Sequence, residues 1–354
     1  MTPMRLLLSL ALAATLATAP AGAQEAVGDR STLAGAGSSL GQEILVRWAA
    51  NYRRATGPAP GDRATGSPLT YESVGSLSGT MRAKDHAVDF GISEIPLPAA
   101  ELARLGLVQF PIAAGGIVVT VHLDNVPPGA LRLSGPVLAD IFLGRVTSWS
   151  DPALAALNPA LPLPAAPIEV VHRLDSSGTT FNATGFLSAT SPVWKDMVGA
   201  GPQVKWPVGS ALRGNDSIAL KVRRTPNSIG FVQYAQVLEL GLNYASIRNQ
   251  AGRFVPPEPR GFQAAATAAR WSGENHFAVA LTDAPGEQSY PISIPIFALL
   301  PKGVPAQQTR TTLGFFRWAL ENGGSDAAAL GYVALPRALV EQIKEYWKKN
   351  LGAS

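Results

Sequence analysis

Three short segments of this sequence combine glycine with small hydroxyl side chains, each where a helix is expected to begin. They are residues 35–40 (GAGSSL), 75–79 (GSLSG) and 175–180 (DSSGTT). The first N–H groups of a helix lack internal partners and lie at the positive end of its dipole, so an oxyanion satisfies them. Serine and threonine add hydroxyl donors, and glycine lets the backbone come close. Such residues are also ordinary helix caps, so one loop alone has little weight, but three favour an anion site.

A charged pair adjoins the third segment. Arg173 and Asp175 are two residues apart, so in an extended segment they point to the same side. The carboxylate can then hold the guanidinium in a fixed orientation towards an anion. The alternative is a surface ion pair, which contributes little to stability. The neighbouring Ser177, Gly178 and Thr179 favour the anion site.

Glu94 is an unexpected residue near an anion site. It follows a strand expected over residues 89–93. A carboxylate there repels an anion unless that anion carries a proton. Phosphate at neutral pH retains a proton and can donate it in a hydrogen bond, whereas sulfate is fully ionised and leaves the acceptor unpaired. The pattern therefore favours a protonated oxyanion, with a turn-capping role for Glu94 as the alternative.

An enzyme, such as a secreted phosphatase or serine hydrolase, is the alternative from another functional class. It needs an activated nucleophile. The segment GSLSG has Leu77 at the middle position, where a nucleophile elbow has serine. His172 is expected on the opposite side of its strand from Arg173 and Asp175. The four histidines do not have the sequence spacing of a metal-binding motif; they are His86, His122, His172 and His276.

A dinucleotide-binding fold is a second alternative, because residues 35–41 (GAGSSLG) are rich in glycine. The last glycine comes one residue late for the dinucleotide fingerprint. No convincing strand is expected before this segment, and a secretion signal disfavours a cytoplasmic cofactor. No cofactor and no metal site is therefore expected.

The length and the hydrophobic pattern predict α/β architecture in two lobes. The chain has 354 residues, more than one core usually holds, with 46% hydrophobic and 15% charged residues. Short apolar runs alternate with helical patterns. A helix is expected over residues 42–56, and Pro336 is expected to open another. Strands are expected at residues 69–74, 88–92, 107–112, 116–121, 168–171 and 229–234.

The N-terminal segment has the pattern of a secretion signal, with cleavage expected after Ala23. Removing it takes away Arg5 and changes the net charge from +4 to +4 − 1 = +3. The sequence has no cysteine, so disulfides and a lipid on an N-terminal cysteine are not expected. These features predict a freely soluble periplasmic protein with no direct membrane anchor. Its charges are scattered, which disfavours nucleic acid as a partner.

The chain resembles the periplasmic phosphate-binding protein of the Pst phosphate ABC transporter from residue 33 to about residue 347. Many short matches follow one another in the family's order. They are Gly35-Ala36-Gly37 with Trp48, Gly75-Ser76, Val88-Asp89-Phe90-Gly91, Asp140-Ile141-Phe142-Leu143-Gly144 with Trp149, Arg173-Leu174-Asp175-Ser176-Ser177-Gly178-Thr179, Lys205-Trp206-Pro207-Val208-Gly209, Gly214-Asn215-Asp216, Ile229-Gly230-Phe231-Val232 and Tyr290-Pro291-Ile292.

The resemblance implies the two-lobed type II periplasmic-binding-protein fold, which closes like a Venus flytrap about two crossing hinge strands. After a signal peptide over residues 1–23, residues 24–114 and 292–354 would form lobe I. Residues 115–291 would form lobe II. The hinge would lie near residues 113–116 and 291–294, and the ligand would bind in the cleft between the lobes.

The resemblance also implies a role for each site residue. Ser39 would donate through its hydroxyl and N–H, Leu40 through its N–H, and Ser76 through its hydroxyl. Arg173 would supply the positive charge, held by Asp175. Glu94 would accept the ligand's proton, although the family usually has aspartate there. The full implied set is Ser39, Leu40, Ser76, Glu94, Arg173, Asp175, Ser177, Gly178 and Thr179.

The implied function is capture of inorganic phosphate and its delivery to the membrane permease of an ABC importer, without catalysis. The protein is expected to act as a monomer. Binding of another protonated oxyanion such as arsenate, and a role in sensing instead of transport, remain open alternatives.

Overall fold

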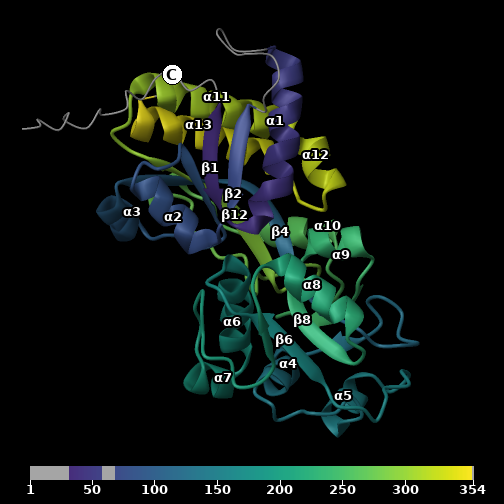
Figure 1. The fold of residues 1–354 in the computed structure, drawn as a ribbon. Helices are drawn as coiled ribbons and strands as arrows, with labels where there is room; N and C mark the ends of the chain where they lie inside the picture. The colour runs from purple at the N-terminus through teal and green to yellow at the C-terminus, as the bar shows by residue number, and fades with distance from the viewer. Residues whose placement is uncertain (1–31, 58–67, 353–354) are drawn as a thin grey trace, which may run out of the picture. The chain divides into compact units, whose positions relative to one another are not determined.

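A computed structural model describes residues 32–57 and 68–352 of the chain (Figure 1). The signal-peptide prediction, residues 1–23, lies outside the described residues. The strands are β1 (Leu33–Gly37), β2 (Leu69–Ser73), β3 (Phe90–Ser93), β4 (Leu107–Val121), β5 (Arg132–Leu133), β6 (Glu169–Arg173), β7 (Ser210–Leu212), β8 (Ser228–Gln233), β9 (Asn243–Tyr244), β10 (Ser246–Arg248), β11 (Phe254–Val255) and β12 (Ser293–Pro301).

Helices separate most of these strands. They are α1 (Gln42–Thr56), α2 (Ser76–Lys84), α3 (Ala99–Leu105), α4 (Gly135–Phe142), α5 (Pro152–Leu157), α6 (Gly178–Thr190), α7 (Pro192–Met197), α8 (Asn215–Arg224), α9 (Tyr234–Leu240), α10 (Pro259–Ala268), α11 (Ala306–Asn322), α12 (Gly324–Ala329) and α13 (Arg337–Leu351), with short 3-10 helices η1 (Ser39–Gly41) and η2 (Gly273–Asn275). Among the described helices, none combines the length and the apolar character needed to cross a membrane.

The main sheet has the strand order β2-β1-β3-β12-β4-β8-β6-β7, with β9 also paired to β4. The long strand β4 joins its two halves. It pairs antiparallel with β12 as far as Gly116, and from Ile117 onward it pairs antiparallel with β8. A separate small sheet has the order β11-β10-β5. The partner change in β4 therefore divides the main sheet into a β1–β3 half and a β6–β8 half.

Helices cover both faces of the β1–β3 half. In Figure 1, α2 lies on one side of β1 and α1 on the other. Phe110 of β4 stands between Phe316 of α11 and Trp347 of α13, with ring centroids 5.5 and 4.9 Å away, respectively. The opposite face is closed by a smaller apolar cluster that includes Ala83 of α2 and Leu102 of α3. Burial of these apolar stripes fixes the helices on the sheet.

The β6–β8 half is layered in the same way. Phe142 of α4 stacks on Phe231 of β8 with ring centroids 4.7 Å apart. On the other face, Ile218 and Val222 of α8 pack with Val171 of β6. The described chain is thus an α/β structure in which each half of the sheet lies between helices, as predicted from the alternation of strand and helix patterns.

Most expected elements form, with informative exceptions. The helix over residues 42–56 and the helix after Pro336 are present as α1 and α13. The strands expected at residues 107–112 and 116–121 are one continuous strand, β4. All 15 residues of β4 are buried, so its sequence shows no polar break where the partner changes. Strand β1 begins at Leu33 and runs into the first glycine-rich segment as far as Gly37, so the expectation that no strand leads into this segment was wrong.

Candidate anion-binding cleft

The three glycine–serine segments line one cleft with a volume of about 410 Å³. The β1–β3 half contributes the end of β1, the end of β2 and the start of α2. The β6–β8 half contributes the residues after β6, the start of α6 and the residues after β7. The cleft is lined by Ser38, Ser39, Ser73, Val74, Gly75, Ser76, Arg173, Asp175, Ser177, Thr179, Arg213 and Gly214.

The first segment turns tightly between β1 and α1. Gly37 has φ +148°, and a Cβ there would lie 2.2 Å from the carbonyl oxygen of Ile92 on β3, so only glycine fits. The hydroxyl of Ser38 accepts a 3.1 Å hydrogen bond from the N–H of Leu40. Leu40 itself is buried and does not line the cleft. Ser39 does line it, and its hydroxyl accepts a 3.1 Å bond from Asn215 Nδ2.

The second segment lies against the third. A Cβ on Gly75 would lie 2.7 Å from the carbonyl oxygen of Ser176, and Gly75 has φ +87°. Ser76, the first residue of α2, is buried. Its hydroxyl donates to Glu94 Oε2 over 2.7 Å and accepts from the N–H of Gly178 over 3.1 Å. One hydroxyl therefore joins a carboxylate to the N-terminus of α6.

Arg173, at the end of β6, is held by two neighbours. Its Nε donates to Asp175 Oδ1 over 2.7 Å, and Nη2 donates to Asp175 Oδ2. Its Nη1 donates to Asn215 Oδ1 over 2.8 Å. Burial acts to raise the pKa of Asp175, but the hydrogen bonds and positive charge of Arg173 outweigh it and the pKa is lowered. Asp175 is therefore ionised at neutral pH and neutralises Arg173.

Glu94 is fully buried behind the cleft and does not line it. Burial raises the pKa of its carboxyl group, because the charged form loses its hydration. Its Oε2 lies so close to α6 that a Cβ on Gly178 would be 1.7 Å away. Its Oε1 is a buried atom without a hydrogen-bond partner in the described structure. The hydroxyls of Ser38 and Ser76 act to lower this pKa, so the Ser38 hydroxyl lies near the carboxyl group. Glu94 can therefore accept one further hydrogen bond at Oε1, from Ser38 or from a ligand.

Helix α6 begins at Gly178, so Gly178 and Thr179 form its first turn. Ser177 caps it, accepting from the N–H of Thr180 over 3.0 Å. The N–H of Ser177 donates to the Pro202 carbonyl over 2.8 Å. Thr179 lines the cleft beside Ser177.

Six of the nine sequence-predicted site residues therefore line the cleft, and Leu40, Glu94 and Gly178 lie behind it. The sequence interpretation assigned no role to Arg213 and Asn215. Asn215 touches both Arg173 and Ser39 and is 1% exposed. The signal that could have found Asn215 is the Gly214-Asn215 pair at a helix start, which follows the same logic as the three serine segments.

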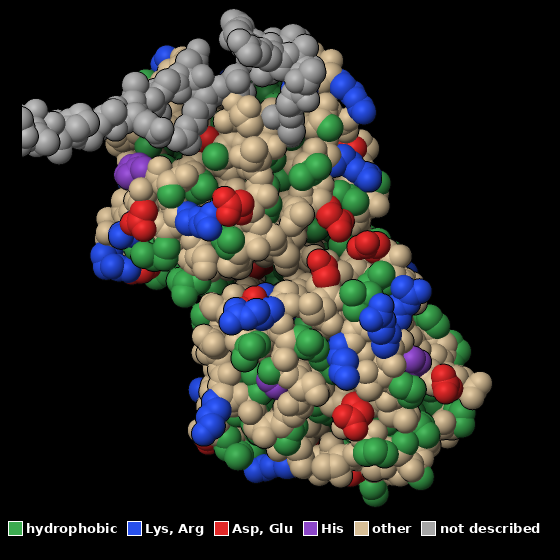
Figure 2. Space-filling view, in the orientation of Figure 1, with side chains coloured by type: hydrophobic (Ala, Val, Ile, Leu, Met, Phe, Trp, Pro, Cys, Tyr) green, Lys and Arg blue, Asp and Glu red, His purple; other side chains and the backbone are tan. Residues whose placement is uncertain are grey.

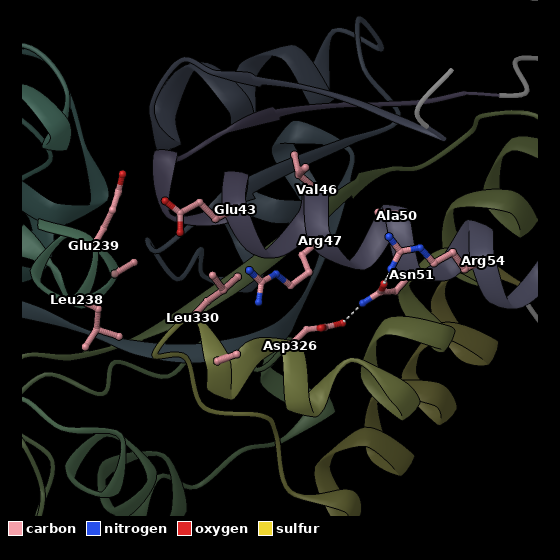
Figure 3. Close-up of a pocket in the computed structure, with 12 residues that line it drawn as sticks. Glu43, Val46, Arg47, Ala50, Asn51, Arg54, Leu238, Glu239, Asp326 and Leu330 are labelled. Atoms are coloured by element: carbon pink, nitrogen blue, oxygen red, sulfur yellow. Dashed lines mark hydrogen bonds between the residues drawn. The ribbon is translucent and has the colours of Figure 1, made fainter. Parts of the chain in front are cut away.

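A larger cavity of about 870 Å³ lies elsewhere, between α1, α9 and α12. Figure 3 shows Glu43 and Arg47 of α1 facing it, with Glu239 on α9 and Asp326 on α12. Asn51 Nδ2 donates to Asp326 Oδ2 over 2.6 Å. Burial, then the charges of Glu239 and Asp216, raise the pKa of Glu43. Its three carboxylates outnumber its two arginines, Arg47 and Arg54, so this cavity is a poor place for an anion.

The remaining polar groups give no competing site in the described residues. No cluster of three or more metal-ligating side chains occurs among them. His172 stacks on Trp206 with ring centroids 4.9 Å apart, and its Nδ1 lies 3.2 Å from the Arg173 carbonyl. On the face shown in Figure 2, basic and acidic side chains are interspersed.

Comparison with known proteins agrees with this geometry. The PBP superfamily domain matches residues 19–322. The phosphate-binding protein PstS of Xylella fastidiosa (strain Temecula1) is 44% identical over 316 residues, covering 89% of this chain and 84% of the relative. The chain belongs to the PstS family of phosphate-binding proteins. The family's member from Haemophilus influenzae is 42% identical over 322 residues, covering 91% of this chain and 94% of the relative.

Solved structures show the same fold at low sequence identity. A phosphate-binding protein from Stenotrophomonas maltophilia matches with a TM-score of 0.64 and 20% identity, covering 89% of this chain and 93% of its own. A putative phosphate ABC transporter substrate-binding protein with bound phosphate from Clostridium perfringens matches with a TM-score of 0.61 and 18% identity, covering 86% of this chain and all (100%) of its own. The predicted fold class, α/β with the two lobes of a periplasmic binding protein, is confirmed.

Proposed function

We propose that this protein binds inorganic phosphate in the cleft formed by the three glycine–serine segments. The observation that carries the proposal is the convergence of Ser39, Ser76 and Thr179 on one cleft beside an arginine held by Asp175. Neutral hydroxyl and N–H donors at helix N-termini suit a tetrahedral oxyanion. The relatives named phosphate-binding proteins support phosphate as that oxyanion.

Phosphate would replace hydrogen bonds that the donors now make with one another. The hydroxyl of Ser76 and the N–H of Gly178 are paired, as are Ser39 and Asn215. Each pair links the β1–β3 half to the β6–β8 half. A bound anion would accept from both partners of a pair, so it would connect the two halves through its own oxygens. For this, the single hydroxyl proton of Ser76, which is now donated to Glu94 Oε2, would turn to the anion. The ligand's proton would be accepted by Glu94 Oε1, which has no other partner among the described residues.

We further propose that the two lobes divide where β4 changes partner. Residues 24–114 and 292–354 would form lobe I, and residues 115–291 would form lobe II. The change between Gly116 and Ile117 supports the boundary near residue 115. Closure about β4 and β12 would exclude water from the cleft and strengthen each hydrogen bond to the anion.

We also propose that the protein delivers phosphate to the permease of a phosphate ABC importer. It would reach the periplasm through the signal peptide and act there as a monomer, without catalysis. Two observations support a binding role over an enzymatic one. His172 is stacked on Trp206 and is not among the residues that line the cleft. Asp175 is engaged with Arg173, so it does not orient a histidine base.

Isothermal titration calorimetry of phosphate-stripped protein with phosphate, arsenate and sulfate tests the proposal. We expect tight one-to-one phosphate binding, and no heat from sulfate. If arsenate binds more tightly than phosphate, the ligand class stands but the preferred ligand is wrong. The absence of phosphate heat at micromolar protein would contradict the proposed function.

A further inference from the structure

We propose that Arg213 is the residue that captures the incoming anion at the rim of the cleft. Its positive charge would raise the rate of phosphate association, without serving as a main contact of the bound ligand. This inference rests on the proposed phosphate-binding function and adds a residue to it, because none of the site residues implied by the family resemblance is Arg213.

The charges of the inner site leave little attraction for an anion. Arg173 is matched by Asp175, which accepts hydrogen bonds from its Nε and Nη2, so this pair is neutral. Glu94 adds a group that can only be neutral or negative. The inner site therefore has a formal charge of zero or below. Neutral donors can hold an anion at contact distance, but their dipoles attract it weakly from farther away.

Arg213 is the remaining charged residue that lines the cleft. Its side chain is exposed, and its guanidinium has no hydrogen-bond or ion-pair partner in the described part of the chain. Arg173, by contrast, is 7% exposed and has each of its three nitrogens bonded. Arg213 is therefore the cleft's cation without a neutralising partner.

The sheet register explains why Arg213 reaches the cleft. Strand β7 runs parallel to β6, with Leu212 opposite Arg173. The N–H of Leu174 donates to the Leu212 carbonyl over 2.9 Å. The next residue after Leu212 thus leaves the sheet at the same carboxyl edge as the site. Gly214 then donates its N–H to Asp175 Oδ1 over 3.2 Å, which ties this loop to the inner site.

An exposed charge acts mainly on the encounter. Water surrounds the Arg213 side chain, so its interaction with a bound ion is screened, whereas its field outside the rim is felt by an approaching ion. The expected consequence of removing it is slower association with little change in dissociation. The effect should diminish with salt, because the Debye length falls from about 10 Å at 0.1 M to about 3 Å at 1 M.

Stopped-flow fluorescence can measure both rates, because the chain has no cysteine and one introduced cysteine can be labelled selectively. All proteins would carry Met81→Cys, at a position on α2 that is 37% exposed. Phosphate association would be compared for otherwise unchanged protein, Arg213→Gln, Arg213→Lys and Arg224→Gln. Arg224 is an exposed residue at the end of α8 that does not line the cleft, so Arg224→Gln makes the same change in net charge.

We expect Arg213→Gln to lower the association rate constant roughly 3- to 10-fold at low ionic strength, in line with steering by a single charge. The dissociation rate constant should change by less than about twofold, since most affinity contacts act on dissociation. Arg213→Lys should keep most of the association rate, Arg224→Gln should resemble the unchanged protein, and 1 M salt should remove the differences.

Two results would overturn the inference while leaving phosphate binding intact. One is an association rate in Arg213→Gln equal to that in Arg224→Gln at low salt. The other is a faster dissociation with unchanged association, which would make Arg213 a contact of the bound ion instead of a capture residue. If the parent protein gives no calorimetric heat with phosphate, the proposed function and this inference fail together.

Discussion

The hydroxyl of Ser76 joins Glu94 to the N-terminus of α6: it donates to Glu94 Oε2 over 2.7 Å and accepts from the Gly178 N–H over 3.1 Å. The carboxyl group is thereby held by one of its oxygens. The other, Oε1, is buried and has no partner in the described structure. A carboxylate arranged in this way can accept one proton-bearing oxygen, which is the property that separates phosphate from sulfate.

Replacing Glu94 by glutamine should weaken this discrimination. The glutamine side chain can donate a hydrogen bond to an unprotonated oxygen, so sulfate would no longer face an unpaired acceptor. We expect calorimetry to show sulfate binding in Glu94→Gln, and phosphate affinity about 10-fold lower, as for loss of a hydrogen bond to a charged group. Glu287→Gln, at an exposed position, is the control and should bind like wild type. If Glu94→Gln still rejects sulfate, Glu94 is not the group that accepts the hydrogen bond from the ligand's proton.

Glu94 should also make the stability of phosphate-stripped protein depend on pH. Burial raises the pKa of its carboxyl group above the unfolded value, so between these two pKa values the native state keeps a proton that the unfolded chain has released. The free energy of unfolding therefore falls as pH rises through this interval.

Glutamine does not titrate, so the free energy of unfolding of Glu94→Gln should depend less on pH. At neutral pH its thermal midpoint should exceed that of wild type by roughly 1–3 °C. Scanning calorimetry between about pH 4.5 and pH 8 spans the ordinary glutamate pKa and neutrality. Parallel curves for the two proteins would mean that Glu94 is not protonated by burial.

Gly178→Ala should disrupt the cleft and lower stability. The new Cβ would lie 1.7 Å from Glu94 Oε2, so the carboxyl group or the start of α6 must move. Overpacking of this kind costs roughly 1–3 kcal/mol. Chemical denaturation of phosphate-stripped protein measures the loss, and calorimetry should show weaker phosphate binding.

Two further variants make the Gly178 test specific. Gly185→Ala on the same helix meets nothing within 4 Å and should be stabilising, by up to about 1 kcal/mol. Glu94→Asp shortens the opposing side chain and should recover part of the loss when combined with Gly178→Ala. Strictly additive effects of the two substitutions would show that the carboxyl group is not what alanine displaces.

Asn215→Ala should weaken phosphate binding although Asn215 is not among the cleft-lining residues. Its amide oxygen accepts from Arg173 and its amide nitrogen donates to Ser39. Loss of both bonds would release the guanidinium from one of its two holders. We expect a phosphate dissociation constant roughly 10-fold higher, the equivalent of one or two hydrogen bonds.

The control for this change is Asn322→Ala, since Asn322 is exposed on α11 and its side chain bonds the Trp318 carbonyl of the same helix. It should leave the dissociation constant unchanged. Equal affinity in Asn215→Ala and Asn322→Ala would mean that Asp175 alone orients Arg173.

The sequence by itself determined those features that depend on residues close together along the chain. The helix over residues 42–56 was predictable because Ile44, Leu45, Trp48 and Ala49 recur at helical spacing, and all four are buried. The three glycine–serine segments and the Arg173–Asp175 pair were also predictable, because residues close along the chain set their geometry. The family resemblance then supplied the fold and the ligand class.

Tertiary structure alone decided how these local pieces meet. The N–H of Gly178 reaches Ser76, 102 residues away, and Asn215 reaches Ser39, 176 residues away. The continuity of β4 across the partner change was hidden, because both halves of the strand are buried throughout and the break lies in their partners. The contacts of Glu94 with α6 and the position of Arg213 at the rim arise from sheet register and close packing. Those depend on distant residues, so no local pattern in the sequence records them.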